Sequence, residues 1–226
     1  MNVCIIPARG GSKRIPRKNI RDFCGKPIIA YSIDVALKSG LFSEVMVSTE
    51  DDEIAAIAKE NGATVPFLRA EKAADDYATL VDVVDEVQNS YLKQERSFKY
   101  ACCILPTAPF LTVENIKRGY EILIENDAAS SRPVIRFSYP IQRAFRMIGN
   151  RVELFSPEYE ITRSQDLEAA FHDAGQFYWI NLNLGFENEK RVGFEVSAML
   201  AQDIDTEEDW RMAEKKYKFL QAEGSC

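Results

Sequence analysis

The stretch that decides the fold spans residues 2–40 and reads NVCIIPARGGSKRIPRKNIRDFCGKPIIAYSIDVALKSG. A short β-rich run at 2–7 is followed by a loop rich in glycine and cations. An amphipathic segment comes next, which Pro27 can open and Gly40 can end. This order of strand, loop and helix predicts the first part of a βαβ unit.

The same alternation continues along the first half of the chain. Further β-rich runs occupy 44–49, 64–68, 100–105 and 134–137. We expect three more helices between them: one opened by Asp51 and Asp52 that ends near Gly62, one over 79–93, and one capped by Thr112. Strands joined by helical crossovers imply an α/β fold with a mostly parallel sheet in three layers, α/β/α.

The rhythm breaks in the second half. Residues 138–150 read as a loop followed by a hairpin around Gly149-Asn150, and 176–184 read as another strand. A last helix runs from Thr206 to about 221, with Asp209 placed to complete a capping box. We therefore expect a single domain over residues 1–226 with a small excursion around 138–175.

The charge is unevenly distributed. Lys and Arg number 28 against 35 Asp and Glu, a net charge of −7, which disfavours a nucleic-acid partner. Seven cations nevertheless fall between residues 9 and 26: Arg9, Lys13, Arg14, Arg17, Lys18, Arg21 and Lys26. This cluster favours a local anion site.

No run approaches the roughly 20 apolar residues that span a bilayer, and the N-terminus lacks the pattern of a signal peptide. The five cysteines form an odd set without the spacing of metal ligands. We expect a cytoplasmic protein with reduced, buried thiols and no membrane partner.

The loop after the first strand carries the chemistry. Gly10 and Gly11 allow the backbone to turn and approach a phosphate, and nearby cations supply the opposite charge. The spacing fits neither a P-loop nor the G-x-G-x-x-G fingerprint. The alternative is a surface turn whose basic residues are only solvated.

The whole string narrows these possibilities. Ile6-Pro7-Ala8-Arg9-Gly10-Gly11-Ser12-Lys13, with Ile15-Pro16 and Lys18-Asn19, resembles the signature loop of the cytidylyltransferases that activate acidic sugars, the CMP-sialic acid synthetase family. The similarity continues through Pro106-Thr107-Ala108-Pro109 to Asp203-Ile204-Asp205-Thr206, so it covers nearly the full chain. The family implies a Rossmann-like nucleotidyltransferase domain. Its members often form homodimers through a protruding excursion, and residues 138–150 would suit that role.

The resemblance implies a role for each matching residue. The family joins the nucleotide of CTP to the anomeric hydroxyl of a keto-acid sugar and releases pyrophosphate. Arg9, Lys18 and Asp205 would be catalytic. The nucleotide would be held by Ala8, Arg9, Gly10, Gly11, Ser12, Lys13, Lys18, Asn19, Arg69 and Thr79, with Asp75 and Asp76 as weaker candidates. The sugar would meet Asn19, Thr107, Arg163 and Gln176.

Asp203 and Asp205 are the candidate metal ligands. Residues two apart in an extended segment point to the same face, so both carboxylates can converge on one Mg²⁺. The alternative is that they only stabilise the positive N-terminus of the last helix. The family resemblance favours the metal.

Two features point to the acceptor sugar. Leu105 stands where sialic acid synthetases usually place a glutamine, which favours a different or less hydroxylated sugar. Residues 163–167 and 172–179 resemble the branch that activates pseudaminic acid, a nine-carbon 5,7-diacetamido nonulosonic acid with a 9-deoxy carbon. The alternatives are a sialic acid or ketodeoxyoctonate enzyme, or a nucleotide-binding module that has lost catalysis.

Overall fold

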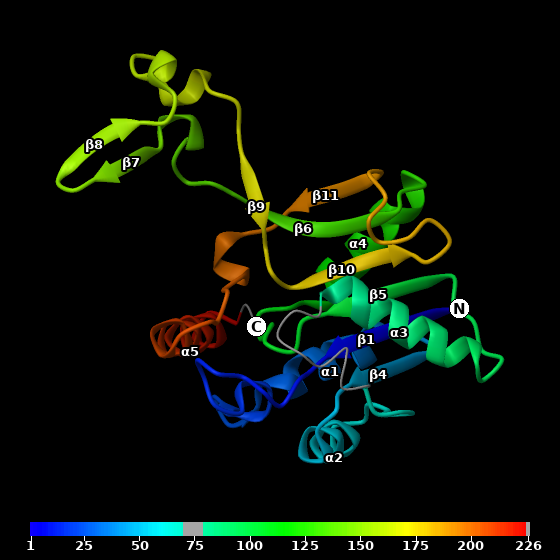
Figure 1. Cartoon of the computed structure of the whole chain (residues 1–226). Coiled ribbons are helices and arrows are strands. Elements are labelled where there is room, and N and C mark those ends of the chain that lie inside the picture. The colour runs from blue at the N-terminus through cyan, green and yellow to red at the C-terminus, as the bar shows by residue number, and fades with distance from the viewer. Residues whose placement is uncertain (70–78, 225–226) are drawn as a thin grey trace.

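The computed structural model describes residues 1–69 and 79–224. Within them, a seven-stranded sheet has the order β11-β6-β10-β5-β1-β4, with β9 paired to β6 (Figure 1). Its strands are β1 Asn2–Pro7, β4 Glu44–Ser48, β5 Tyr100–Ile104, β6 Ser130–Arg136, β9 Phe171–Asp173, β10 Phe177–Asn181 and β11 Arg191–Glu195. Strands β4, β1, β5, β6 and β11 run in one direction, and β9 and β10 in the other. The expected mostly parallel sheet is confirmed.

Helices pack on both faces of this sheet. They are α1 Ile28–Ser39, α2 Asp52–Glu60, α3 Leu80–Leu92, α4 Val113–Glu125 and α5 Glu207–Ala222. Along β1, Val3 and Ile5 belong to the core that α3 closes, whereas Cys4 and Ile6 belong to the core that α1, α2 and α4 close. Because alternate side chains of a strand point to opposite faces, β1 is buried on both sides. This is the three-layer α/β/α arrangement that the sequence predicted.

The helix ends follow the local signals. Gly40 ends α1 with a φ of 67°, a left-handed conformation that glycine adopts without steric cost. Asp51 accepts hydrogen bonds from the second and third residues of α2, and Thr112 caps α4 in a similar way. Thr79 and Thr206 each form a complete capping box, at α3 and α5.

Three strand predictions need correction, and two strands of the sheet were missed. Residues 64–68 form no strand, because Thr64 makes only an isolated bridge to Met46 and Pro66 has no N–H to continue a ladder. Strand β6 begins at Ser130, ahead of the predicted 134–137, and β10 ends at Asn181, short of 184. Strands β9 and β11 were not predicted at all. In β11, Gly193 interrupts the β-rich pattern.

The excursion lies between β6 and β9 and projects away from the sheet (Figure 1). It contains the hairpin of β7 Phe145–Ile148 and β8 Arg151–Leu154, whose turn has Gly149 at a φ of 60°. The predicted turn at Gly149-Asn150 is confirmed. A smaller ladder, β2 Asp22–Phe23 with β3 Lys26–Pro27, precedes α1.

Candidate active site

A cleft of about 570 Å³ opens at the edge of the sheet where β1 and β5 end. We call it the loop cleft. It is lined by Pro7, Arg9, Ser12, Lys13, Arg14, Lys18, Asn19, Arg69, Thr79, Leu80, Val83, Leu105, Pro106, Thr107, Asp203 and Asp205. The cations predicted to contact the nucleotide and both predicted metal ligands are in this set. Ligands of open α/β sheets typically bind at this edge.

Hydrogen bonds made by two buried residues fix the conformation of the loop after β1. Ala8 is fully buried and donates its N–H to the Ser48 carbonyl at 2.9 Å, so this N–H is not available to cytidine. Residues Lys18–Ile20 form a 3₁₀ turn, η1, in which Asn19 is buried. The Asn19 Nδ2 donates to the Arg9 carbonyl at 2.9 Å, which ties the end of the loop to its start.

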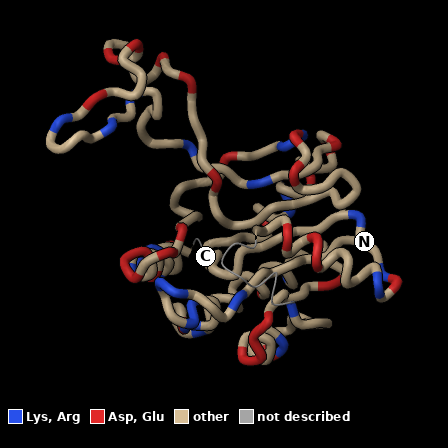
Figure 2. The backbone as a smooth tube through the Cα atoms, viewed as in Figure 1, with Lys and Arg blue, Asp and Glu red and all other residues tan. Residues whose placement is uncertain are grey.

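Asp205 lies opposite the cations of the loop. Its Oδ2 accepts from Arg14 at 2.9 Å, and its Oδ1 lies 3.4 Å from the Lys18 Nζ, which also donates to the Ile204 carbonyl at 2.7 Å. Arg21 adds an ion pair to Glu207 at 2.5 Å. In Figure 2, blue segments of the N-terminal loop lie beside the red first turn of α5, which contains Glu207, Glu208 and Asp209. A segment nearly two hundred residues away therefore completes the site.

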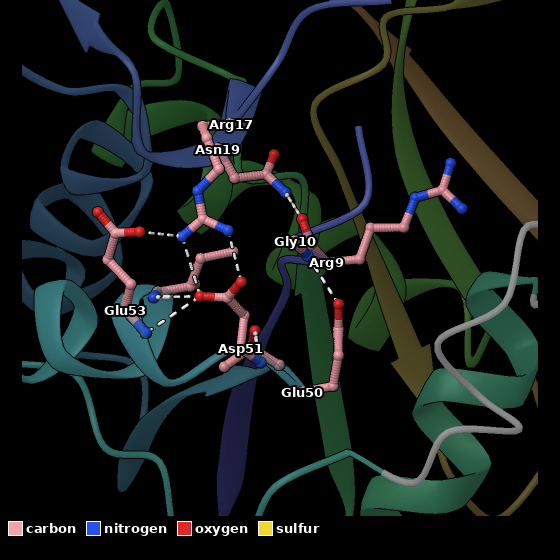
Figure 3. A network of polar contacts seen from close by, with 9 residues as sticks. Arg9, Gly10, Arg17, Asn19, Glu50, Asp51 and Glu53 are labelled. Atoms are coloured by element: carbon pink, nitrogen blue, oxygen red, sulfur yellow. Dashed lines mark hydrogen bonds and ion pairs between the residues drawn. The ribbon is translucent and has the colours of Figure 1, made fainter. Parts of the chain in front are cut away.

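Gly10 does not behave as predicted. Gly10 donates its N–H to the Glu50 Oε1 at 2.7 Å and does not line the loop cleft (Figure 3). The expectation that this N–H points at a phosphate is wrong for the structure described here. Neither Gly10 nor Gly11 has a positive φ. Gly10 is required instead by close packing, because an added Cβ would lie 2.5 Å from the Asp51 Oδ2.

Arg69 and Thr79 also line the loop cleft. Arg69 is 7% exposed and is fixed by Ser48, whose Oγ accepts from Nε at 3.0 Å and whose carbonyl accepts from Nη2 at 2.6 Å. Burial lowers the pKa of Arg69, and the charge of Glu50 opposes this shift. The Thr79 hydroxyl donates to Asp82 at 2.7 Å within its capping box. Asp75 and Asp76 lie outside the described residues.

The predicted sugar ligands divide into two groups. Asn19 and Thr107 line the loop cleft. Gln176 is 2% exposed and does not line the loop cleft; its Nε2 donates to the Leu200 carbonyl, and its Oε1 is buried without a hydrogen-bond partner. Arg163 is exposed on the excursion, outside the cleft of its own chain. Neither residue lines the loop cleft of its own chain, so the sugar contacts of Gln176 and Arg163 stay predictions.

A second cavity of about 580 Å³ shares Leu105 and Asp203 with the loop cleft. Its polar lining includes His172, Asp173, Tyr178 and Lys216. Burial lowers the pKa of Lys216 and, together with Asp173, raises that of Tyr178. Residues 172–179 were singled out by their resemblance, but the cavity itself could not be predicted, because its lining comes from five separate segments. Phe177 and Trp179, by contrast, are fully buried.

Within the described ranges, no helix is both long and apolar enough to cross a membrane.

The family model described as cytidylyltransferase matches residues 3–218. A pseudaminic acid cytidylyltransferase of Campylobacter jejuni subsp. jejuni serotype O:2 is 44% identical over 96% of both chains. A CMP-N,N'-diacetyllegionaminic acid synthase of Legionella pneumophila is 32% identical over 94% of both. The structure also resembles the solved structure of a CMP:2-keto-3-deoxy-manno-octonic acid synthetase complexed with CTP, with a TM-score of 0.69 over 98% of this chain and 99% of that one. At 17% sequence identity, this is a similarity of fold.

Proposed function

Because this chain belongs to the cytidylyltransferase family, we propose that it transfers CMP from CTP to the anomeric hydroxyl of pseudaminic acid and releases pyrophosphate. The observation that carries the proposal is the loop cleft, in which four cations and two carboxylates predicted from the sequence line one cavity. The acceptor is supported by relatives of that name that are 43–44% identical over 96% of their length.

The proposed reaction is a substitution at the α-phosphorus. The anomeric hydroxyl loses its proton to solvent and its oxygen forms the new bond to the α-phosphorus. The bond from the α-phosphorus to the oxygen that bridges it to the β-phosphorus breaks, and pyrophosphate leaves with that oxygen. Arg9 and Lys13 are placed to hold the triphosphate, and Lys18 to offset the charge that develops at the reacting phosphate. Its anchorage on the Ile204 carbonyl keeps Lys18 oriented before substrate binds. Catalysis then depends mostly on positioning and on charge.

We further propose that Asp203 and Asp205 hold Mg²⁺. Both line the cleft, and carboxylate oxygens are ligands that Mg²⁺ prefers. Among residues 1–69 and 79–224, no group of three or more acidic, histidine or cysteine side chains could hold a metal. The proposal therefore leaves the other positions to phosphate oxygens and water. When bound, Mg²⁺ would neutralise charge on the phosphates.

We propose that the acceptor sugar binds in the part of the loop cleft that Leu105 and Thr107 line. Leu105 lies where the loop cleft meets the second cavity, so a sugar placed there would reach both. Its aliphatic side chain offers no hydrogen bond, which suits a 9-deoxy sugar better than a hydroxylated one. The second cavity would then receive the remaining polar substituents, because His172 and Lys216 line it.

We propose that the protein is a homodimer formed through its excursion. Phe145, Met147 and Val152 share one face of the hairpin, since Met147 pairs with Val152 and residues two apart point the same way. They are 58%, 74% and 60% exposed, an apolar patch typical of protein contacts. A sugar contact by Arg163 would require this second copy. Sedimentation velocity of a Met147→Asp variant should show a monomer, and an unchanged dimer would contradict the proposal.

A cytoplasmic location is proposed from the thiols. Cys4, Cys102 and Cys103 are free and buried, and burial raises the pKa of each. Free thiols persist in reducing compartments. Fractionation of cells that produce the protein would test the location, and recovery outside the cytoplasm would contradict it.

A sugar panel tests the proposed function. Purified protein is incubated with CTP, Mg²⁺ and pseudaminic, sialic or ketodeoxyoctonic acid, and pyrophosphate release is measured. Fastest turnover with pseudaminic acid is expected. Equal or faster turnover with sialic acid would overturn the acceptor assignment, and CTP binding without pyrophosphate release from any sugar would favour the module that has lost catalysis. Omission of Mg²⁺ should abolish turnover.

A further inference from the structure

Three acidic residues lie behind the loop and have no part in the proposed chemistry. We call Glu50, Asp51 and Glu53 the acidic anchor; they follow β4 and begin α2. Asp51 accepts two hydrogen bonds from the guanidinium of Arg17, at 2.5 and 3.0 Å, and Glu53 forms a second ion pair with the same group (Figure 3). Two-point contacts of this kind fix direction as well as distance.

Asp51 is itself held rigidly. Its Oδ1 accepts from the N–H groups of Glu53 and Ile54, both at 3.0 Å, at the N-terminus of α2. The pKa of Asp51 falls to about 2, mainly because of the hydrogen bond from Arg17. Asp51 therefore stays charged at neutral pH and links a helix end to the loop.

Arg17 has an unusual backbone. Its φ of 55° and ψ of 30° are left-handed, a conformation sparsely populated by residues with a side chain. Ile20 and Arg21 both donate their N–H to the Arg17 carbonyl at 3.0 Å. The conformation of Arg17 therefore sets the course of η1, and with it the positions of Lys18 and Asn19 in the loop cleft.

The acidic anchor also holds the start of the loop. Glu50 accepts the N–H of Gly10 at 2.7 Å, and Asp51 lies so close to Gly10 that no side chain fits there. Gly10 directly follows Arg9, which lines the loop cleft. Both ends of the cation-rich loop are thus attached to one short segment.

We propose that Asp51 is a positioning residue for the nucleotide: without touching CTP, it holds Arg17 and packs against Gly10 so that the loop cations are arranged before CTP binds. The inference rests on the proposed function, since it takes the loop cleft as the CTP site. It adds a residue to that function. A preorganised loop loses less conformational freedom on binding, which increases affinity.

The test is an Asp51→Asn variant. Asparagine is also a good N-cap residue, so α2 keeps its cap while the charged pair with Arg17 is lost. We expect the dissociation constant for CTP, measured by calorimetry without acceptor, to rise roughly tenfold, an ordinary size for coupling between contacting residues. KM for CTP should rise similarly, and KM for the sugar should change little. Asp51→Glu should recover part of the CTP affinity.

An Arg96→Gln variant is the matched control. Arg96 pairs with Glu44 at the opposite end of β4, and its side chain is 44% exposed against 38% for Arg17. It should leave CTP binding unchanged. If Asp51→Asn fails to fold, Arg17→Gln removes the same pair from the other side, together with the pair to Glu53, and should weaken CTP binding at least as much.

The outcomes separate the two proposals. A folded Asp51→Asn or Arg17→Gln variant with wild-type CTP affinity would overturn the positioning role, as would equal loss in Arg96→Gln. If wild-type protein binds CTP but turns over no acidic sugar, the proposed function fails, and the comparison of CTP affinities still decides the role of Asp51.

Discussion

Replacing Leu105 by glutamine tests whether one side chain selects the acceptor. Leu105 directly follows β5, and its backbone is fixed on both sides: its N–H donates to the Gln176 carbonyl and its carbonyl accepts from the Ser32 Oγ, both at 2.8 Å. The direction of the side chain is thereby set. It lines the loop cleft and the second cavity together.

The expected size of the effect follows from the amide. A buried polar group without a partner costs about 1–3 kcal/mol, and because Leu105 is only half-buried we take about 1–2 kcal/mol. This corresponds to roughly a 5- to 30-fold change in a ratio of rates. The ratio of kcat/KM for pseudaminic acid to that for sialic acid should fall by this factor, because the amide disfavours the deoxy sugar and can bind a hydroxyl.

The assay is pyrophosphate release at several concentrations of each sugar with saturating CTP. Leu105→Met is the control, since it conserves volume and apolar character and should keep the wild-type ratio. KM for CTP should stay unchanged in both variants. A folded Leu105→Gln enzyme with the wild-type ratio, or an equal shift in Leu105→Met, would refute the role of this side chain.

Three further results are expected. Lys18→Ala should lower kcat/KM by roughly 10²–10³-fold in the pyrophosphate assay. Lys117 is exposed on α4, so the control variant Lys117→Ala should keep the wild-type kcat/KM. A fully active Lys18→Ala enzyme would show that Lys18 has no part in the mechanism. Gly119→Ala should lower the free energy of unfolding by about 1–3 kcal/mol, because the added Cβ would lie 2.8 Å from the Phe177 ring. An unchanged midpoint of urea denaturation in this variant would contradict the prediction. Since the pKa of Asp51 is depressed from 3.8 to about 2, its contribution to stability is complete above about pH 5 and is lost as the pH falls towards 2. Urea midpoints at pH 6 and 3 should therefore differ less for Asp51→Asn than for wild type, and an equal difference would contradict the sign.

Much of the site could be predicted because its parts are local. The loop after β1 is continuous in sequence, and its cations Arg9, Lys13 and Lys18 all line the loop cleft. The caps Asp51 and Thr206 were predicted because a cap acts within one turn of its own helix. The strand predicted at 64–68 was wrong because β-propensity does not specify a partner strand, and Pro66 has no N–H to donate to a neighbouring strand.

The sequence by itself determined the alternation of strands and helices, the hairpin turn at Gly149 and the cation-rich loop. Only the tertiary structure decided that β10 enters antiparallel between β5 and β6, that Asp205 meets Arg14 and Lys18, and that Gly10 is required by the approach of Asp51. The physical reason is the range of the interactions. Capping and periodicity act within a few residues of the chain, whereas these contacts join segments from about 40 to nearly 200 residues apart, whose proximity is set by the packing of the sheet and its two helical layers.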